Sequence, residues 1–403
     1  MKYQGYQAHA DMMEQLRSFA QAALATISHP WLDSYPGIRE LSAGYAVLSS
    51  LEVTHTRPDF AIGTIRVGRR ELEVREEVIY SSPFATLLRF RKEGVENQPR
   101  VLIVAPMSGH FATLLRDTAR TMLADHDVYI TDWHNARDVP LAAGRFGLDE
   151  YAQHLMTFLE VIGPGVHVVA VCQPCVSALT AVAIMAEDEN PAQPRSLTLM
   201  AGPIDTRVNP TKVNQLATGK PVEWFAANLI STVPQRHTGA MRRVYPGFVQ
   251  LTAFMSMNPE RHLAAFKGLY VSLVEGDVEK ANVIQKFYRE YLAVSDLDAE
   301  FYLETISFIF QEHRLATGKL QWSGRPVNPA AIRRTALLTI EGQHDDICAV
   351  GQTMAAHDLC RHIPPHMKLH HMQAGVGHYG VFSGRRWSQY VYPFVREMIH
   401  EHS

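Results

Sequence analysis

The sequence predicts an α/β protein built around a doubly wound, mostly parallel sheet, and three observations support this class. The chain has 403 residues, of which 46% are hydrophobic and 20% charged, and this composition suits a globular protein with a large core. From residue 100 onward, short apolar runs alternate with longer amphipathic ones, as buried parallel strands alternate with helices. Ahead of them, residues 71–80 and 84–90 are rich in β-branched and aromatic side chains and predict an antiparallel pair.

The helices and strands are expected in a regular order. Two amphipathic helices come first, at residues 11–24, ended by His29-Pro30, and at 39–51. The parallel strands are expected at 101–105, 127–132, 166–172, 197–201 and 336–341, and helices between the first four of them at 112–123, 148–162 and 176–186. Right-handed crossovers between such strands place helices on both faces of the sheet.

A long insertion interrupts the alternation between residues 201 and 336, because ordinary connections in such folds have about 2–6 residues. We therefore expect an N-terminal helical extension at 1–70, a core at 71–204 and 326–403, and a lid at 205–325. The insertion is rich in Met and aromatic residues at helical spacing. Most of these are expected to form the core of the lid, and a few to line an apolar substrate cleft.

The candidate nucleophile is Cys172, which lies between an apolar strand and a helix-like run in the segment Ala-Val-Cys-Gln-Pro. In the α/β-hydrolase fold this position is the nucleophile elbow G-x-S-x-G, whose small residues permit a strained turn. Here Cys replaces Ser, and Ala170 and Pro174 occupy the two glycine positions. Proline is tolerated in a first helical turn because its missing N–H would have no partner there. A buried structural cysteine is the alternative interpretation of Cys172.

The expected acid and base follow in the chain order of such hydrolases, which is nucleophile, acid, histidine. Asp345 and Asp346 follow the strand at 336–341, and His378 lies among glycines near the C-terminus. The residues alone do not distinguish the two aspartates. A helix N-terminus and His378 are expected to lower the thiol pKa of Cys172 from about 8.5, so that a thiolate attacks an ester and forms a thioester.

Two backbone N–H groups are candidates for the oxyanion hole: that of Gln173, directly after the nucleophile, and that of Met107, in the loop after the strand at 101–105. Ser108 is the second choice in that loop and a candidate substrate contact. His134 follows the strand at 127–132 at its carboxyl end, where active sites gather in open α/β sheets. It is a candidate pocket residue, and a loop histidine bonded to backbone is the structural alternative.

Several other classes of function are excluded or disfavoured. A net charge of −3 gives no general attraction to nucleic acid. No metal-ligand or nucleotide-binding motif is present, so neither a metal nor an organic cofactor is expected. The start of the sequence does not resemble a secretory signal, no apolar run is long enough to span a membrane, and four cysteines do not make a disulfide scaffold, so a cytoplasmic protein is expected. Cys172 and Cys175 form a C-x-x-C motif, and a thioredoxin-like redox site is a further alternative.

Five segments, taken in order, resemble the intracellular poly(3-hydroxybutyrate) depolymerases of granule-storing bacteria: VLIVAPMSGHFATLLRDTAR, DVYITDWHNARDVP, VVAVCQP, EGQHDDICAVGQT and GVGHYGVFSGRRW. The resemblance spans about residues 70–400 and implies an α/β-hydrolase fold. It implies Cys172 as the nucleophile, Asp345 as the acid and His378 as the base. It also implies cleavage of polyester on cytoplasmic storage granules, without a cofactor.

Two rival functions stay open at this stage. Polyhydroxyalkanoate synthases resemble the chain more distantly, but they keep the glycines that Ala170 and Pro174 replace, which favours a depolymerase over a synthase-like acyltransferase. A granule-binding protein without activity is the second rival. The thioester can be resolved by water or by the thiol of coenzyme A, and the sequence does not choose between them. The oligomeric state is also open, a homodimer included.

Overall fold

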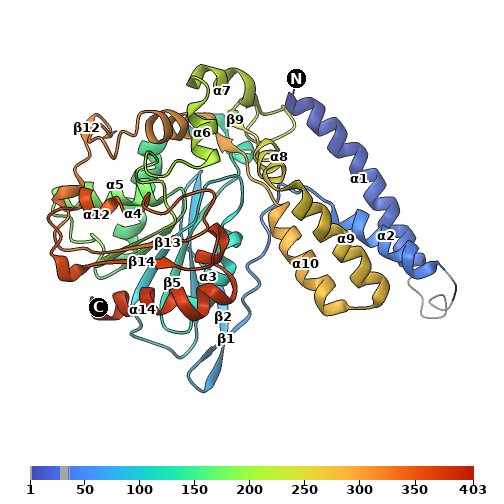
Figure 1. The fold of residues 1–403 in the computed structure, drawn as a ribbon, viewed down its shortest axis with the longest axis horizontal. Coiled ribbons are helices and arrows are strands. Elements are labelled where there is room, and N and C mark those ends of the chain that lie inside the picture. The colour runs from blue at the N-terminus through green and yellow to red at the C-terminus, as the bar shows by residue number, and fades with distance from the viewer. Residues whose placement is uncertain (1, 28–34, 36) are drawn as a thin grey trace.

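A nine-stranded sheet forms the centre of the computed structural model, which describes residues 2–27, 35 and 37–403 (Figure 1). The strand order is β1-β2-β3-β5-β4-β6-β7-β13-β14. The strands span β1 (Thr64–Val67), β2 (Arg70–Ser81), β3 (Ala85–Lys92), β4 (Arg100–Val104), β5 (Asp127–Trp133), β6 (His167–Val171), β7 (Ser196–Met200), β13 (Ala336–Gly342) and β14 (Lys368–Gln373). The pairings from β1 to β5 are antiparallel and all later ones are parallel. This arrangement is the α/β-hydrolase fold.

The predicted antiparallel pair and all five predicted parallel strands are confirmed. The parallel strands are recognisable in sequence because helices cover both faces of the sheet, so their side chains are almost all buried: every residue of β6, β7 and β13 is buried. The sheet begins at β1, inside the segment expected to be the N-terminal extension. That strand alternates half-buried and exposed residues at the sheet edge and carries little apolar signal.

Helices cover the two faces of the sheet in pairs, α4 (Leu148–Ile162) with α5 (Cys175–Glu187), and α3 (Arg116–Met122) with α14 (Tyr392–Glu401). The predicted helix at 112–123 begins as the 3-10 turn η1 (Ala112–Leu115) before it becomes α3. The shorter helical segments of the core are η2 (Ala136–Asp138), η3 (Leu141–Ala143), η5 (Pro329–Ala331), α12 (Ala356–Leu359), η6 (Pro365–Met367), η7 (His378–Val381), α13 (Gly384–Arg386) and η8 (Trp387–Val391).

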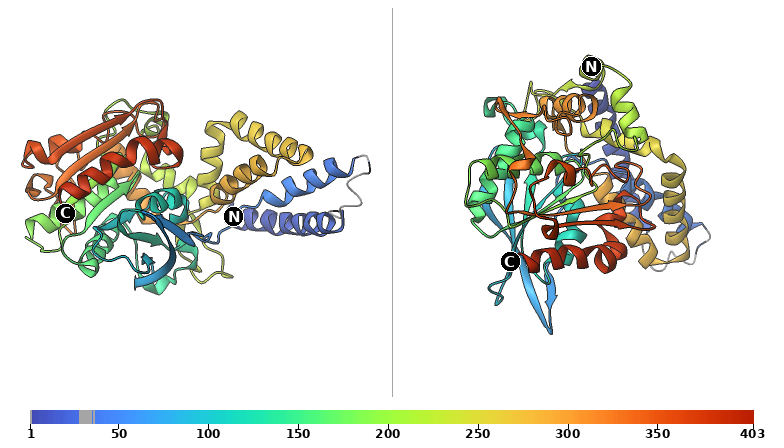
Figure 2. Two further views of the ribbon diagram at one scale, coloured as in Figure 1. Left: turned by 90° about the horizontal axis from the view of Figure 1, so that it is seen from below. Right: turned by 60° about the vertical axis from the view of Figure 1, so that its left-hand side comes forward.

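The N-terminal extension is a pair of helices, α1 (Lys2–Ile27) and α2 (Ile38–Ser50), that packs together and contacts α9 (Pro259–Glu275). The views in Figure 2 show this pair and the pair α9 and α10 (Val278–Tyr291) projecting together from the body of the protein. Helix α1 begins well before the predicted residue 11. The predicted helix end at His29-Pro30 lies outside the described residues.

The insertion between β7 and β13 is mainly helical, as predicted. Besides α9 and α10 it contains α6 (Lys212–Thr218), α7 (Val222–Leu229), α8 (Gly247–Met257) and α11 (Ala299–Glu304), which continues as the π-helical turn η4 (Thr305–Gln311). It also contains strands that the sequence did not predict: β8 (Ser231–Thr232), β9 (Arg243–Tyr245) and β10 (Leu297–Asp298), which form a small sheet, and the hairpin β11 (Gln321–Trp322) and β12 (Arg325–Pro326). Within the described ranges, no helix combines the length and apolar character needed to cross a membrane.

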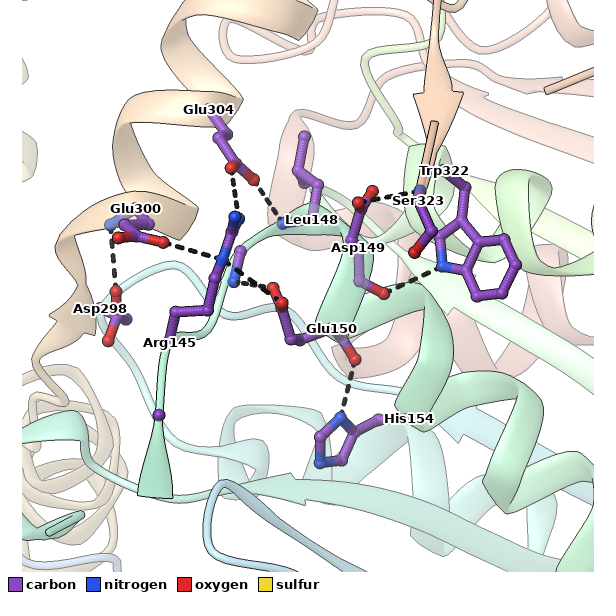
Figure 3. Close-up of polar contacts among 12 residues, drawn as sticks. Arg145, Leu148, Asp149, Glu150, His154, Asp298, Glu300, Glu304, Trp322 and Ser323 are labelled. Atoms are coloured by element: carbon purple, nitrogen blue, oxygen red, sulfur yellow. Dashed lines mark hydrogen bonds and ion pairs between the residues drawn. The ribbon is translucent and has the colours of Figure 1, made fainter. Parts of the chain in front are cut away.

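The insertion is fixed to the core at the N-terminal end of α4 (Figure 3). The carboxylate of Glu304, on α11, accepts a hydrogen bond from the N–H of Leu148 at 2.7 Å and pairs with Arg145 at 2.6 Å. Arg145 also pairs with Glu300 at 2.8 Å and with Glu150 at 3.3 Å. The first N–H groups of a helix lack intrahelical acceptors and carry partial positive charge, so a carboxylate there is favourable. This contact sets the position of α11 over the sheet.

The first turn of α1 is attached to the insertion through buried Tyr3. Its hydroxyl donates to Oδ2 of Asp296 at 2.5 Å, and the N–H of Gly247 donates to Oδ1 of the same carboxylate at 2.8 Å. Asp296 is fully buried, and burial raises its pKa to about 6, although both donors act to lower it. The ring of Tyr3 also packs edge-on against Phe248 of α8, with 5.6 Å between centroids.

We expect Tyr3→Phe to reduce the free energy of unfolding by about 1–2 kcal/mol at neutral pH, because the buried Asp296 carboxylate loses a donor. The variant should raise the pKa of Asp296 further. Since the folded state already binds this proton more tightly than the unfolded state, the loss should be larger at pH 8, where the carboxylate is charged, than at pH 5. Urea unfolding at both pH values measures it, with the exposed Tyr390→Phe as control. A loss that is the same at both pH values would contradict this account.

Candidate active site

Cys172 lies in the sharp turn between β6 and α5 with a backbone φ of +69°. Non-glycine residues rarely adopt this left-handed conformation, which costs about 1–2 kcal/mol and persists only where the surroundings impose it. Two hydrogen bonds hold Cys172 in this conformation. Its N–H donates to the carbonyl of Met200 on β7 at 2.7 Å, and its carbonyl accepts from the N–H of Cys175 at 3.1 Å. The thiol is free and half-buried. The turn has the geometry of a nucleophile elbow.

The space for this turn comes from Gly202, a residue that the sequence reasoning missed. A Cβ at Gly202 would collide with the side chain of Cys175 and lie 3.1 Å from the carbonyl oxygen of Cys172. Thr353 holds Gly202 in place, because its hydroxyl accepts from the N–H at 2.8 Å and donates to the carbonyl at 3.0 Å. Pro174 is accommodated at the N-cap of α5 with φ −67°. The small residue that the elbow requires is therefore Gly202, directly after the end of β7. The Ala-Gly-Pro segment after this strand was the feature of the sequence that could have indicated it.

His378 and Asp345 are joined by a hydrogen bond of 2.8 Å between Nδ1 and Oδ2. Both side chains are buried. The other oxygen of Asp345 accepts from the N–H groups of Ile347 at 2.9 Å and Cys348 at 2.8 Å, which fixes the carboxylate. The neighbouring Asp346 is exposed and borders a cavity instead. The structure thus separates the two aspartates that the residue pattern left equivalent.

Cys172 lies close enough to His378 to act on the charge of its ring, so the structure brings Cys172, His378 and Asp345 together. Burial acts to lower the pKa of His378. The interactions with Cys172 and Asp345 outweigh burial and raise the pKa well above its ordinary value. A raised pKa favours the imidazolium form, and an imidazolium stabilises a neighbouring thiolate, which is the nucleophilic form of cysteine.

Two cavities meet at these residues. One, the Cys172 cavity, has a volume of about 480 Å³ and is bordered by Cys172, Met107, Ser108 and Gln173. Its remaining walls are mostly apolar side chains of the insertion, among them Val213, Leu216, Trp224, Phe225, Phe301 and Phe310. The other, the His378 cavity, has a volume of about 650 Å³ and lies between His378 with its neighbours and the helices α9 and α10. Phe254 and Ile347 border both cavities.

The predicted oxyanion donors border the Cys172 cavity. In the described part of the chain, the N–H groups of Met107 and Gln173 have no protein acceptor, so both are available to a ligand. The loop from Met107 onward is held by the insertion, because Ser295 donates its N–H to the carbonyl of Gly109 at 2.9 Å. Nε2 of buried His110 lies 3.2 Å from the carbonyl of Tyr291, which ties the same loop to α10.

The structure favours the structural alternative for His134. Its Nε2 lies 2.8 Å from the hydroxyl of Thr86, and its Nδ1 lies 3.0 Å from the carbonyl of Pro83. Both ring nitrogens are therefore occupied, one by Pro83 in the turn before β3 and one by Thr86 of β3, and His134 borders neither cavity. The substrate contact predicted for His134 is therefore not supported. The prediction relied on its position at the end of β5, and that position does not determine the direction of the ring.

Cys175 is fully buried, and its thiol lies 3.3 Å from the carbonyl of Ala170. Burial raises its pKa well above the ordinary value, so it is poorly suited to a redox pair with Cys172. Among residues 2–27, 35 and 37–403, no three His, Cys, Asp or Glu side chains are grouped to hold a metal ion.

A family model described as the C-terminus of poly(3-hydroxybutyrate) depolymerases matches residues 201–403, half of the chain, including Asp345 and His378. The chain belongs to the poly(3-hydroxybutyrate) depolymerase family. The protein is accordingly a carboxylic ester hydrolase. Cys172 lies outside the matched residues, so its place in the site depends on the elbow geometry.

Solved structures similar to this chain include a putative lipase from Acinetobacter baumannii AYE, with 14% identity, 82% of this chain and 93% of that chain covered, and a TM-score of 0.46. A 2-hydroxy-6-oxo-6-phenylhexa-2,4-dienoate hydrolase from Rhodococcus sp. strain RHA1 has 14% identity, coverage of 82% and 99%, and a TM-score of 0.46. A thermophilic esterase from Thermogutta terrifontis has 13% identity, coverage of 84% and 98%, and a TM-score of 0.41. A comparison with curated proteins found no match.

The pKa of the His378 ring is expected to lie well above its ordinary value in the free enzyme, because the charges of Cys172 and Asp345 hold its proton. Cys172→Ala and Asp345→Asn should each lower this pKa, since each removes a negative charge from the ring. Asp346→Asn should lower it less. Ring chemical shifts of isotope-labelled histidine, followed as the pH is varied, measure the effect. A wild-type ring that loses its proton below pH 6.5 would refute the assignment.

Proposed function

We propose that this protein cleaves the ester bonds of poly(3-hydroxybutyrate) through a Cys172-His378-Asp345 triad and a thioester acyl-enzyme. The observation that carries the proposal is the half-buried thiol of Cys172, held in a strained turn, close to His378 and open to an apolar cavity. Family membership supports the polyester as substrate. The assembled residues argue against a granule-binding protein without activity, and the depolymerase family argues against a synthase-like acyltransferase.

The reaction follows from the position of each group. The thiolate of Cys172 attacks the ester carbonyl, and the resulting oxyanion is held by the N–H groups of Met107 and Gln173. The imidazolium of His378 then gives its proton to the departing alkoxide oxygen as the C–O bond breaks. Neutral His378 next takes a proton from water, which attacks the thioester and releases the acid and the thiolate. Asp345 keeps the ring oriented and stabilises its charged form.

The shape and polarity of the Cys172 cavity suit a polyester. Short 3-hydroxyacyl units carry no charge and offer only carbonyl and methyl groups, so apolar walls with a few polar contacts are the appropriate receptor. Ser108 borders the cavity beside the predicted oxyanion hole and is the proposed polar contact to substrate. The proposed site of action is the surface of cytoplasmic polyester granules.

Cys172→Ala is expected to reduce depolymerisation of amorphous polymer by at least about a thousandfold, because the covalent route is lost. The fold should be retained, since alanine fits the turn and removes only one sulfur. Buried Cys175→Ser is the matched control and should retain turnover, whereas a redox pair would require both thiols. Mass spectrometry of enzyme quenched during turnover should show an acyl adduct on the peptide that contains Cys172. Unchanged activity of the Cys172→Ala variant would overturn the proposal.

The acceptor of the acyl group is tested by the products. With amorphous polymer alone we expect 3-hydroxybutyrate and short oligomers. With coenzyme A added, we expect part of the product as 3-hydroxyacyl-coenzyme A, because exchange between two thioesters is nearly isoenergetic and a second thiol can replace water. Liquid chromatography with mass spectrometry separates these products. Complete absence of the coenzyme A product would leave water as the acceptor.

A further inference from the structure

We propose that the His378 cavity binds the alcohol-side part of the substrate, and that Arg261 in this cavity binds the free carboxylate at the end of a polyester chain. The enzyme would then cut preferentially near carboxyl ends. This inference rests on the proposed function and adds to it the direction in which the substrate lies and the group that recognises its end.

The direction follows from the two cavities and the roles of the residues at their junction. The leaving oxygen must lie beside His378, which gives it a proton, and the oxyanion must lie beside the N–H groups of Met107 and Gln173. Met107 and Gln173 border the Cys172 cavity, whereas His378 and the following residues Tyr379 and Gly380 border the other cavity. The acyl part therefore occupies the Cys172 cavity, and the alcohol part the His378 cavity.

The chemistry of the polymer then decides which chain end can reach each cavity. In poly(3-hydroxybutyrate) the alcohol side of every ester leads toward the carboxyl end of the chain, and the acyl side leads toward the hydroxyl end. A negative charge can therefore reach the site only through the His378 cavity, and only when the bond to be cut lies close to the carboxyl end. The mostly apolar Cys172 cavity receives the uncharged part of the chain.

Arg261 is placed to meet that charge. It lies on α9, is exposed and borders the His378 cavity, and its side chain makes no ion pair or hydrogen bond with the described part of the chain. The positive charge of Arg261 acts on a residue next to the triad. Burial raises the pKa of Tyr379, which follows His378, and the charge of Arg261 opposes that rise. A guanidinium without a partner, in a cavity next to the reacting bond, suits a carboxylate because it offers a planar pair of donors.

Aromatic side chains give this part of the cavity a firm wall. Phe287 stacks on Tyr291 with centroids 5.4 Å apart, and the ring of His262 lies 5.3 Å from that of Tyr291. The hydroxyl of Tyr288 lies 2.8 Å from Nδ1 of His262. These contacts join α9 to α10 and hold the backbone that carries Arg261.

The cavity also contains an opposing charge. Asp346 borders it, and Asp346 and Arg261 form no ion pair with each other. The two charges are therefore separate, and Asp346 repels a carboxylate from its own side of the cavity. Among the described residues that border this cavity, Arg261 is the only lysine or arginine.

The test compares the free acid of a linear 3-hydroxybutyrate trimer with its methyl ester, which has the same esters between units but no terminal charge. Wild-type enzyme should have a kcat/KM for the free acid about two- to fivefold above that for the methyl ester. Arg261→Gln should abolish the preference by slowing only the free acid, and Arg261→Lys should keep part of it. Arg289→Gln, which removes an exposed charge from α10 outside both cavities, should leave the preference unchanged.

Each result is decisive. Equal cleavage of the two trimers by wild-type enzyme overturns the inference about Arg261 while the proposed function stands. Equal slowing of both trimers by Arg261→Gln also overturns it, because a structural effect would not distinguish them. Failure of wild-type enzyme to cut either trimer or amorphous polymer, or equal cleavage by Cys172→Ala, would instead refute the proposed function.

Discussion

The site depends on a single backbone constraint, the left-handed conformation of Cys172. The hydrogen bond from its N–H to Met200 ties the turn to the neighbouring strand, and the absence of a side chain at Gly202 lets the end of that strand approach. Because β6 and β7 are buried along their whole length, the turn rests on a closely packed part of the sheet. The strain is balanced by the packing of the sheet, and this leaves the thiol projecting toward His378.

Much of the fold is readable from the sequence because its strongest signals have a simple physical origin. Strands covered on both faces become apolar runs, and α4 has the expected bounds because its buried and exposed residues repeat at the helical period. The strands β8 to β10 could not be predicted in this way, since two or three residues are too few to show a period. Their pairing is set by contacts between distant parts of the insertion.

The candidate site could be predicted only in part from the sequence, because the sequence does not give the orientation of the side chains. Chain order places Cys172, an aspartate and His378 at the same edge of the sheet, but it cannot say which of Asp345 and Asp346 faces the ring. The N–H groups of Ile347 and Cys348 decide that, by holding Asp345 inward. His134 shows the converse case: its position at the end of β5 is as predicted, yet its ring turns toward Thr86 and Pro83.

The attachment of Tyr3 to Asp296 has a consequence for the distant loop at Met107. Asp296 follows Ser295, which holds Gly109, so the first helical turn of the chain and the loop with the proposed oxyanion donor share one short segment. A change that loosens Tyr3 from Asp296 would therefore be transmitted through Ser295 to the loop that carries Met107. In this architecture helix α1 gives mechanical support to the candidate site, although Tyr3 borders neither cavity.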